Sequence, residues 1–337
     1  MESKSTEDLG SLAAAASSFP LLVYDHGDQP DNSQMVFSVA DGSTRTLQIP
    51  ELRNYRCLET PSGLVLTVDP ATLQSSLWNP QTGEMIALPA MDKALPEHCR
   101  CLISDAITVP DCLVLVYDLT QTKLLFCQVR GGNAWFSLSY DIGMYAVPKG
   151  RSSPPTKIPF TAMAAVHGKF YLVNAPGRDV LGVLSLSHDP EPRLEIANFD
   201  APAPTMVTDA LKIITLCYLL ESFQELFMVC LFYVHYNFER PEEVGAYKMD
   251  FDKHEWCKVT DIGDRAFILG PASFAASCCA KEHGLKSGCV YFPYDLMGDN
   301  NDCHIFDLME GTREVAGPTQ HVPVLSRKPF WLLPVMH

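Results

Sequence analysis

Residues 76–89 read SLWNPQTGEMIALP, in which two short apolar segments flank the polar turn Gln81-Thr82-Gly83. A polar turn with glycine between two such segments is typical of a β-hairpin. The same pattern recurs along the chain, with Asp, Gly or Pro in the turn. The six predicted hairpins cover residues 36–50, 76–89, 124–141, 183–199, 246–262 and 303–317. The sequence therefore predicts a chain built from repeated hairpins.

Further apolar segments extend each hairpin to a unit of four strands. One strand directly precedes each hairpin, at residues 21–24, 64–68, 112–117, 169–173, 225–233 and 288–291. Another strand precedes five of these, at residues 57–60, 101–104, 161–166, 213–220 and 267–277. The first unit lacks this strand, and the segment PFWLLP at Pro329–Pro334 supplies it.

Four-stranded units that repeat roughly every 40–60 residues are typical of a β-propeller. We therefore predict an all-β fold, a propeller of six four-stranded blades whose first blade is closed by the C-terminal strand. Such closure removes the free sheet edges between the two ends. Seven blades are the alternative, because the long segment 267–277 does not divide cleanly into strands. We expect residues 1–18 to form a flexible tail and residues 19–337 to form a single domain.

One stretch, residues 213–234, is apolar enough to raise the question of a membrane span. Glu221, Ser222, Gln224 and Glu225 lie in its middle. A spanning helix would have to bury two carboxylates at the bilayer centre, which is costly. We therefore predict two strands with a polar turn at Glu221–Gln224, and no membrane association.

Composition excludes two broad classes of protein. Hydrophobic residues make up 47% of the 337 residues and charged residues 19%, so the chain is not intrinsically disordered. It carries 25 Lys and Arg against 40 Asp and Glu, a formal net charge of -15. A nucleic-acid binder needs a basic face to neutralise phosphates, so we expect no nucleic-acid partner.

The cysteines and the start of the chain predict the compartment. The chain has 12 cysteines, but it is too long and too rich in apolar residues for a small disulfide-stapled scaffold. Residues 1–19 contain Glu2, Glu7 and Asp8 and lack the basic region and long apolar core of a secretory signal. We expect a cytoplasmic or nuclear protein whose cysteines mostly pack as small apolar side chains.

Several segments, taken in their order and spacing, resemble the plant KIB-type β-propeller domain, known as domain of unknown function 295 and common in F-box proteins. They are FPLL at 19–22, LETPSGLVL at 58–66, LWNPQTGEMIALP at 77–89, AVHGKFYL at 165–172, YLLESFQELFMV at 218–229, IGDRAFILG at 262–270, GCVYF at 288–292 and IFDLMEG at 305–311. The similarity covers nearly all of residues 19–334.

The resemblance implies a propeller that binds partner proteins. In many members of this family an F-box before the propeller docks onto a Skp1–cullin ubiquitin ligase. An F-box takes roughly 40–50 residues of helical sequence, and only 18 residues precede the first predicted strand. We therefore expect no Skp1 docking by the usual route. The resemblance predicts a kelch-like module that binds targets, or competes with F-box relatives, in the ubiquitin pathway.

Motifs that carry catalysis or bind cofactors are absent from the sequence. It contains no G-x-S-x-G, G-x-G-x-x-G or phosphate-binding G-x-x-x-x-G-K-[ST]. Two Cys/His groups, His98/Cys99/Cys101 and Cys278/Cys279/His283/Cys289, lack the spacing of a zinc site. Asp250 and Asp252 flank a hairpin turn and are expected to be solvated. We predict no cofactor, no metal and no enzyme activity.

The alternative is an enzyme with a small-molecule site at the mouth of the propeller channel. Such a site needs histidines and carboxylates that converge near the axis. The predicted junctions between blades contain few histidines, only His98 and His321.

A basic residue precedes the innermost strand at each of the six predicted junctions between blades. These residues are Arg56, Arg100, Lys157, Lys212, Arg265 and Lys328. In a regular propeller these junctions lie at one end of the ring, around the channel. The pattern predicts a positive rim on an otherwise acidic body, suited to an acidic or phosphorylated protein partner. The competing expectation is that these side chains point outward or pair with neighbours such as Glu97, Asp209 and Asp264.

Overall fold

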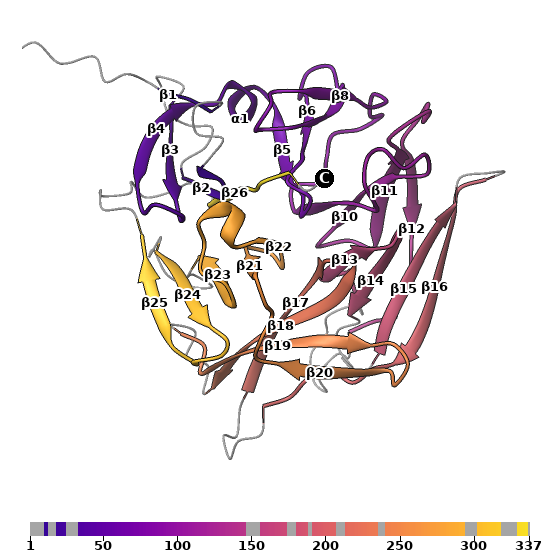
Figure 1. The fold of residues 1–337 in the computed structure, drawn as a ribbon. Coiled ribbons are helices and arrows are strands. Elements are labelled where there is room, and N and C mark those ends of the chain that lie inside the picture. Colours follow the sequence, from indigo (N-terminus) through magenta and orange to yellow (C-terminus); the bar gives the residue numbers. More distant parts are fainter. Residues whose placement is uncertain are drawn as a thin grey trace, which may run out of the picture.

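The computed structural model describes residues 10–12, 18–24, 33–145, 156–173, 180–187, 191–206, 213–234, 240–293, 302–317 and 329–335. These residues form six β-sheets arranged around an axis as the six blades of a propeller (Figure 1). One short helix, α1 (Pro50–Asn54), and one 3₁₀ turn at Lys281–His283 complete the named elements. No helix in this part of the chain is long and apolar enough to cross a membrane.

Blades two to five each contain four strands in chain order, counted outward from the axis. Blade two contains β5 (Arg56–Glu59), β6 (Val65–Val68), β7 (Ser75–Trp78) and β8 (Met85–Ala87). Blade three contains β9 (Cys99–Ile103), β10 (Leu113–Asp118), β11 (Lys123–Gln128) and β12 (Phe136–Ser139). Blade four contains β13 (Ala162–Val166), β14 (Lys169–Val173), β15 (Val180–Ser187) and β16 (Arg193–Asp200). Blade five contains β17 (Ile213–Ser222), β18 (Glu225–Val234), β19 (Glu243–Asp250) and β20 (Glu255–Val259).

The first blade joins the two ends of the chain, as predicted. Its strands are β26 (Phe330–Leu332), β2 (Leu21–Tyr24), β3 (Ser33–Ser38) and β4 (Thr44–Gln48). In the antiparallel pair of β26 and β2, Leu332 lies opposite Leu21 and Trp331 opposite Leu22. The prediction of six blades closed by a C-terminal strand is confirmed, and the seven-bladed alternative is not.

A short strand from the predicted tail lies on the outer edge of the first blade. This strand, β1 (Gly10–Ser11), pairs in parallel with β4. Leu12 is buried in the same cluster as Leu47 and Leu52. Apart from residues 10–12 and Ser18, the predicted flexible tail lies outside the described residues.

The sixth blade also has a fifth strand, which the sequence did not predict. Its order from the axis outward is β22 (Ala275–Cys279), β21 (Arg265–Leu269), β23 (Cys289–Pro293), β24 (Cys303–Asp307) and β25 (Arg313–Ala316). The predicted single strand at 267–277 is instead a hairpin, because the chain turns at residues 270–274. β21 runs parallel to β23 and antiparallel to β22. Figure 1 shows β22 near the centre of the ring.

The strand directions define two ends of the ring. In blades two to five the first and second strands, and the third and fourth, are joined at what we call the turn end, where the turn between β3 and β4 of blade one also lies. The crossovers between blades lie at the opposite crossover end. β21 is inserted between β22 and β23 and runs opposite to the innermost strands of the other blades. Its first residue, Arg265, therefore lies at the turn end.

Local side-chain capping explains why many hairpins turn where they do. In five turns an Asp or Asn side chain accepts hydrogen bonds from the backbone amides two and three residues further on. These residues are Asp69, Asn79, Asp118, Asp250 and Asp307. In four of the turns the residue four positions on has positive φ: Leu73, Gly83, His254 and Gly311. These four turns thus need a residue that tolerates the left-handed region.

Replacing Gly83 by alanine tests this requirement. Gly83 has φ +76, and a Cβ there would meet no atom within 4 Å, so only backbone strain opposes the change. We expect Gly83→Ala to lower the free energy of unfolding by about 1–2 kcal/mol, measured by urea denaturation. Glu84→Ala, at the next position, should change it by less than about 0.5 kcal/mol. Equal effects of the two variants would show that position 83 does not require a residue that tolerates positive φ.

The apolar stretch 213–234 forms two paired strands, as predicted. β17 and β18 pair antiparallel over their full length, from Ile213 opposite Val234 to Ser222 opposite Glu225. Phe223 and Gln224 form a two-residue turn with φ +50 and +65. Positive φ at both positions is typical of the tight turns that match the twist of a hairpin.

The core lies in layers between neighbouring blades. Between blades five and six, for example, Phe227 and Val229 of β18 share a buried cluster with Phe267 of β21 and Val290 of β23. All cysteines are free thiols, and eight of the twelve are buried. Most of them therefore pack as small apolar side chains, as predicted.

Candidate functional site

Arg100, one of the predicted basic residues, reaches from blade three to blades two and six near the axis. Its Nη1 donates to Glu59 Oε1 at 2.6 Å, at the end of β5. Its Nε donates to the carbonyl of Ala272 at 3.1 Å, and Nη2 donates to the carbonyl of Pro271. Both carbonyls belong to the turn between β21 and β22. The guanidinium also lies 5.6 Å from the centre of the Phe274 ring.

This Arg100–Glu59 ion pair is buried, and its role is structural. The side chain of Arg100 is 13% exposed and that of Glu59 is 6% exposed. Burial raises the pKa of Glu59, while Arg100 and the Trp331 backbone amide partly offset that shift. Since the guanidinium donates to Glu59 in blade two and to the turn at Pro271 and Ala272 in blade six, Arg100 links blades two, three and six.

Two other predicted residues lie at the crossover end and are already paired. Arg56 begins β5, and its Nη2 donates to the backbone carbonyl of Glu97, a neighbour named in the sequence analysis. Lys157 Nζ lies 2.9 Å from Asp141 Oδ2, with both side chains about half exposed. Such exposed pairs contribute little to stability, so both cations could be shared with a ligand.

Arg265 lies at the other end of the ring. Its Nη2 is 3.3 Å from Glu225 Oε2, and its guanidinium stacks 4.9 Å from the ring centre of Phe223 and 5.2 Å from that of Phe227. Arg265 begins β21, whereas Arg100 contacts the turn that follows β21. The structure therefore does not bring Arg265 together with Arg100.

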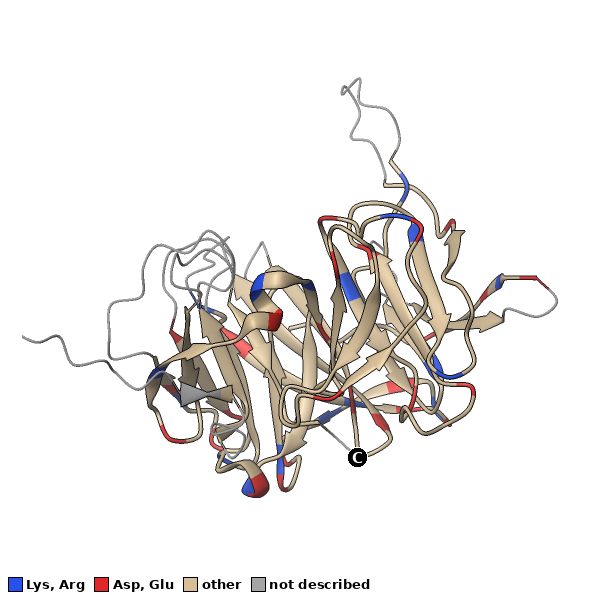
Figure 2. Cartoon of the chain, turned by 90° about the horizontal axis from the view of Figure 1, so that it is seen from above, with Lys and Arg blue, Asp and Glu red and all other residues tan. Residues whose placement is uncertain are grey.

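The predicted rim of six is thus divided. Arg56 and Lys157 lie at the crossover end, Arg100 is buried at the axis, and Arg265 lies at the turn end. Lys212 and Lys328 lie outside the described residues. Figure 2 shows basic and acidic residues at both ends of the ring. Whether any of these residues binds a partner stays a prediction.

Sequence reasoning missed the two most exposed apolar side chains at the turn end. Phe223, in the β17–β18 turn, and Met309, in the β24–β25 turn, are each 62% exposed. We call Phe223 and Arg265, which contact each other, together with Met309 in a turn of blade six at the same end of the ring, the turn-end patch. Phe223 lies in the apolar stretch 213–234, so the composition of that stretch does not indicate that Phe223 is exposed. The polar turn predicted at Glu221–Gln224, which contains Phe223, was the one available sign.

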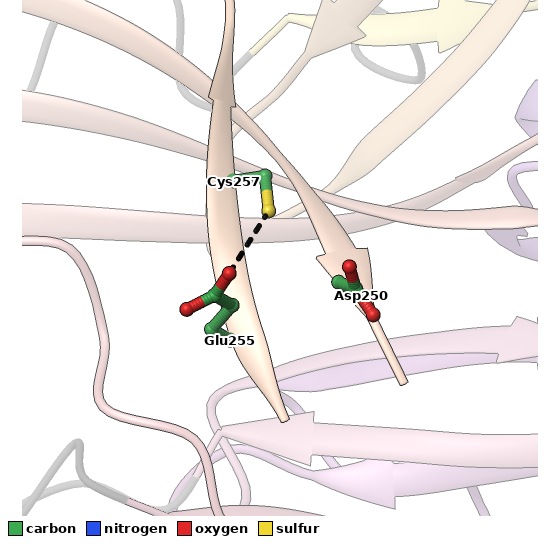
Figure 3. A group of neighbouring side chains, drawn as sticks. All are labelled: Asp250, Glu255 and Cys257. Atoms are coloured by element: carbon green, nitrogen blue, oxygen red, sulfur yellow. Dashed lines mark hydrogen bonds between the residues drawn. The ribbon is translucent and has the colours of Figure 1, made fainter. Parts of the chain in front are cut away.

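Possible metal ligands gather at one place in the described part of the chain, around the β19–β20 turn (Figure 3). Asp250, Glu255 and Cys257 point toward one another, and Cys257 Sγ lies 3.8 Å from Glu255 Oε1. Lys253 Nζ already pairs with Asp250 at 3.0 Å and with Glu255 at 3.7 Å. Lys253 therefore offsets part of the negative charge within the turn, as expected for a solvated acidic turn.

The histidines named for an enzymatic site do not meet in the described residues. His98 is exposed at the crossover end, and His321 lies outside the described residues. At the turn end, however, the exposed His167 lies near Glu221. Burial raises the pKa of Glu221, and the Gln224 amide, His167 and Arg265 partly offset this shift.

A buried histidine in blade six makes stability depend on pH. His304 is 7% exposed, and its Nδ1 accepts a hydrogen bond from Arg313 Nε at 2.9 Å. Burial and the Arg313 charge lower its pKa from 6.5 to about 4, although Asp302 acts in the opposite direction. The unfolded state thus takes up the proton first, and stability falls as the pH drops from 6.5 toward 4.

We expect this histidine to contribute about 2 kcal/mol to the loss of stability between pH 7 and pH 5. His304→Gln keeps an acceptor for Arg313 and removes the titration. Urea denaturation of both proteins at the two pH values should show the wild type losing about 2 kcal/mol more than the variant. Equal losses would show that His304 does not couple folding to pH.

Comparison with known proteins agrees with the fold and gives one family. Residues 36–307 match the family described as KIB1-4 beta-propeller. A comparison with curated proteins gave no match. The match covers strands of all six blades, from β3 to β24.

Solved structures give only distant likenesses. The periplasmic gluconolactonase PpgL of Pseudomonas aeruginosa is 13% identical with a TM-score of 0.39, over 93% of this chain and 98% of that one. A protein of unknown function from Bacteroides caccae is 10% identical with a TM-score of 0.36, over 87% and 91%. An extracellular domain from B. thetaiotaomicron is 9% identical with a TM-score of 0.36, over 89% of this chain but only 38% of that one. At these TM-scores none of the likenesses bears on function.

Proposed function

Since the chain belongs to the KIB1-4 β-propeller family, we propose that it is a non-catalytic module that recognises a target protein. The resemblance to F-box-associated propellers supports a role within ubiquitin-ligase pathways, either in target recognition or in competition with F-box relatives. The proposed location is the cytoplasm or nucleus. The proposed partner is a protein with an acidic or phosphorylated segment.

The observation that carries this proposal is the turn-end patch. Interface centres are enriched in aromatic residues, methionine and arginine, and the patch combines Phe223, Met309 and Arg265. Arg265 is held by its stacking on Phe223 and Phe227, so little side-chain entropy is lost when it binds. Its ion pair with Glu225 is long, at 3.3 Å, so a carboxylate or phosphate of the partner can compete for the guanidinium.

The position of β22 and Arg100 near the axis of the ring favours a binding site on the surface over one in a central channel. β22 lies near the centre of the ring (Figure 1), and Arg100 ties its hairpin to blades two and three. A target would therefore meet the exposed turns at one end of the ring. The hairpin turns are short and well capped, so they present their side chains in a fixed arrangement.

Quantitative affinity capture tests the proposal. The tagged full-length protein and the double variant Phe223→Ser/Met309→Ser are used to recover partners, which mass spectrometry quantifies. We expect the variant to recover the main partner about tenfold less, because truncation of central interface residues typically costs at least that much affinity. Met144→Ser, which removes a 52% exposed methionine at the crossover end, is the matched control. It should recover the partner like the wild type.

A second double variant tests the opposite end of the ring. Arg56→Glu/Lys157→Glu reverses two charges at the crossover end, of which Lys157 is exposed and Arg56 half-buried. Loss of the partner in this variant alone would move the binding face to that end and contradict the turn-end assignment. If no captured protein depends on either end, the alternative of an enzyme is favoured, for which the proximity of His167 and Glu221 is the supporting observation.

A further inference from the structure

Two thiols in blade five face each other across a pair of strands. Cys217 of β17 lies directly opposite Cys230 of β18, and their Sγ atoms are 3.8 Å apart. Directly opposed residues in an antiparallel pair have Cα atoms about 4.5–5.5 Å apart, which lies within the range that a disulfide spans. Rotation of the two side chains that brings the sulfurs from 3.8 Å to about 2.05 Å would allow a bond at this strand separation.

The two thiols differ in access to solvent. Cys217 is half-buried, whereas Cys230 is fully buried between blades four and five in a cluster with Met228 and Tyr247. Cys217 is thus the thiol with better access to an oxidant in solution, and Cys230 is placed to resolve the product.

We propose that Cys217 and Cys230 form a thiol–disulfide exchange site whose oxidant is glutathione disulfide. The Cys217 thiolate attacks one sulfur of glutathione disulfide, forms a mixed disulfide and releases one glutathione. The Cys230 thiol loses its proton and attacks the Cys217 sulfur, which releases the second glutathione. The protein loses two electrons and two protons, and glutathione disulfide gains them as two thiols. The product is a cross-link between the two innermost strands of blade five.

The site would make blade five responsive to the thiol redox state. The bond would tie β17 to β18 beneath the turn that carries Phe223, and excess reduced glutathione would reverse it. This inference does not rest on the proposed partner binding, and its failure would leave that proposal untouched.

Peptide mapping of the full-length protein after incubation with glutathione disulfide tests the site. Trypsin cuts at Lys212 and Lys248 but not at Arg240, which precedes Pro241, and only two cysteines lie in this peptide. A second protease that cuts after Glu221 or Glu225 separates the two cysteines. We expect the two fragments to stay joined, with a mass lower by two hydrogens, and to separate after reduction. Fragments that separate without reduction would overturn the proposal.

Variants distinguish the roles of the two thiols. Cys230→Ser should stop at the mixed disulfide, with one glutathione on Cys217, while Cys217→Ser should leave Cys230 unmodified. Cys257→Ser, which removes a half-buried thiol on β20, is the matched control and should give the joined fragments like the wild type. A wild-type protein that stops at the mixed disulfide, or that links either cysteine to another thiol, would contradict the pairing.

Discussion

Replacing Arg100 by methionine should lower the free energy of unfolding by about 3–5 kcal/mol. The change leaves the carboxylate of Glu59 buried without its cation, and it removes the donors that bind the carbonyls of Pro271 and Ala272. Urea denaturation followed by tryptophan fluorescence would measure the loss. Adding Glu59→Leu should recover most of it, because the buried charge is then removed as well.

The loss in Arg100→Met should also depend on pH in a defined direction. Without Arg100, burial holds the pKa of Glu59 above its unfolded value, so the carboxyl is neutral at low pH and stability falls as the pH rises. The variant should therefore lie closer to the wild type at pH 5 than at pH 8. Lys157→Met, which breaks an exposed pair with Asp141, should cost less than about 1 kcal/mol. A similar loss of stability in both variants would show that the contacts of Arg100 with Glu59, Pro271 and Ala272 do not stabilise the fold.

Trp331→Ala should be about as damaging, with an expected loss of about 3–5 kcal/mol. Trp331 is 1% exposed and packs where β26 meets blade six. Its Nε1 donates to the carbonyl of Leu269 at 3.0 Å, which joins the first blade to the hairpin of the sixth. Truncation would leave a large cavity and an unpaired buried carbonyl at the closure of the ring.

The matched control for this prediction is Trp256→Ala on the outer strand β20. Trp256 is partly exposed and packs only against the edge of a core cluster, so we expect a loss of about 1–2 kcal/mol. Hydrogen exchange would add a spatial test. In Trp331→Ala the amides of β2 and β26 should lose protection before those of blade three. Uniform loss of protection would show that the closure is no weaker than the rest of the ring.

Most of the fold could be predicted because its signals are local. Each hairpin has its own turn chemistry, as in Asn79 to Gly83, and apolar segments on both sides. The hairpin of β21 and β22 could not be predicted, because residues 267–277 are apolar whether the chain runs straight or turns back. Only packing against β17 and β23 decides the direction there.

The candidate site was less predictable, for a related reason. The prediction of a positive rim rested on the assumption that every basic residue before an innermost strand lies at the same end of the ring. The inserted strand β21 breaks that rule and carries Arg265 to the turn end. Arg100 follows the rule, but the same hairpin offers it two backbone carbonyls, so it is buried. Exposure of Phe223 depends on which two residues form a turn, a detail that composition does not show.

The closure of the first blade also sets an order for folding. β2 appears early in the chain and β26 late, so the edge of β2 has no partner until nearly the whole sequence has been synthesised. Contacts between such distant segments form slowly, and an unpaired strand edge invites association with other chains. During synthesis, the apolar segment LLVY at Leu21–Tyr24 is therefore the place where a chaperone would be needed most.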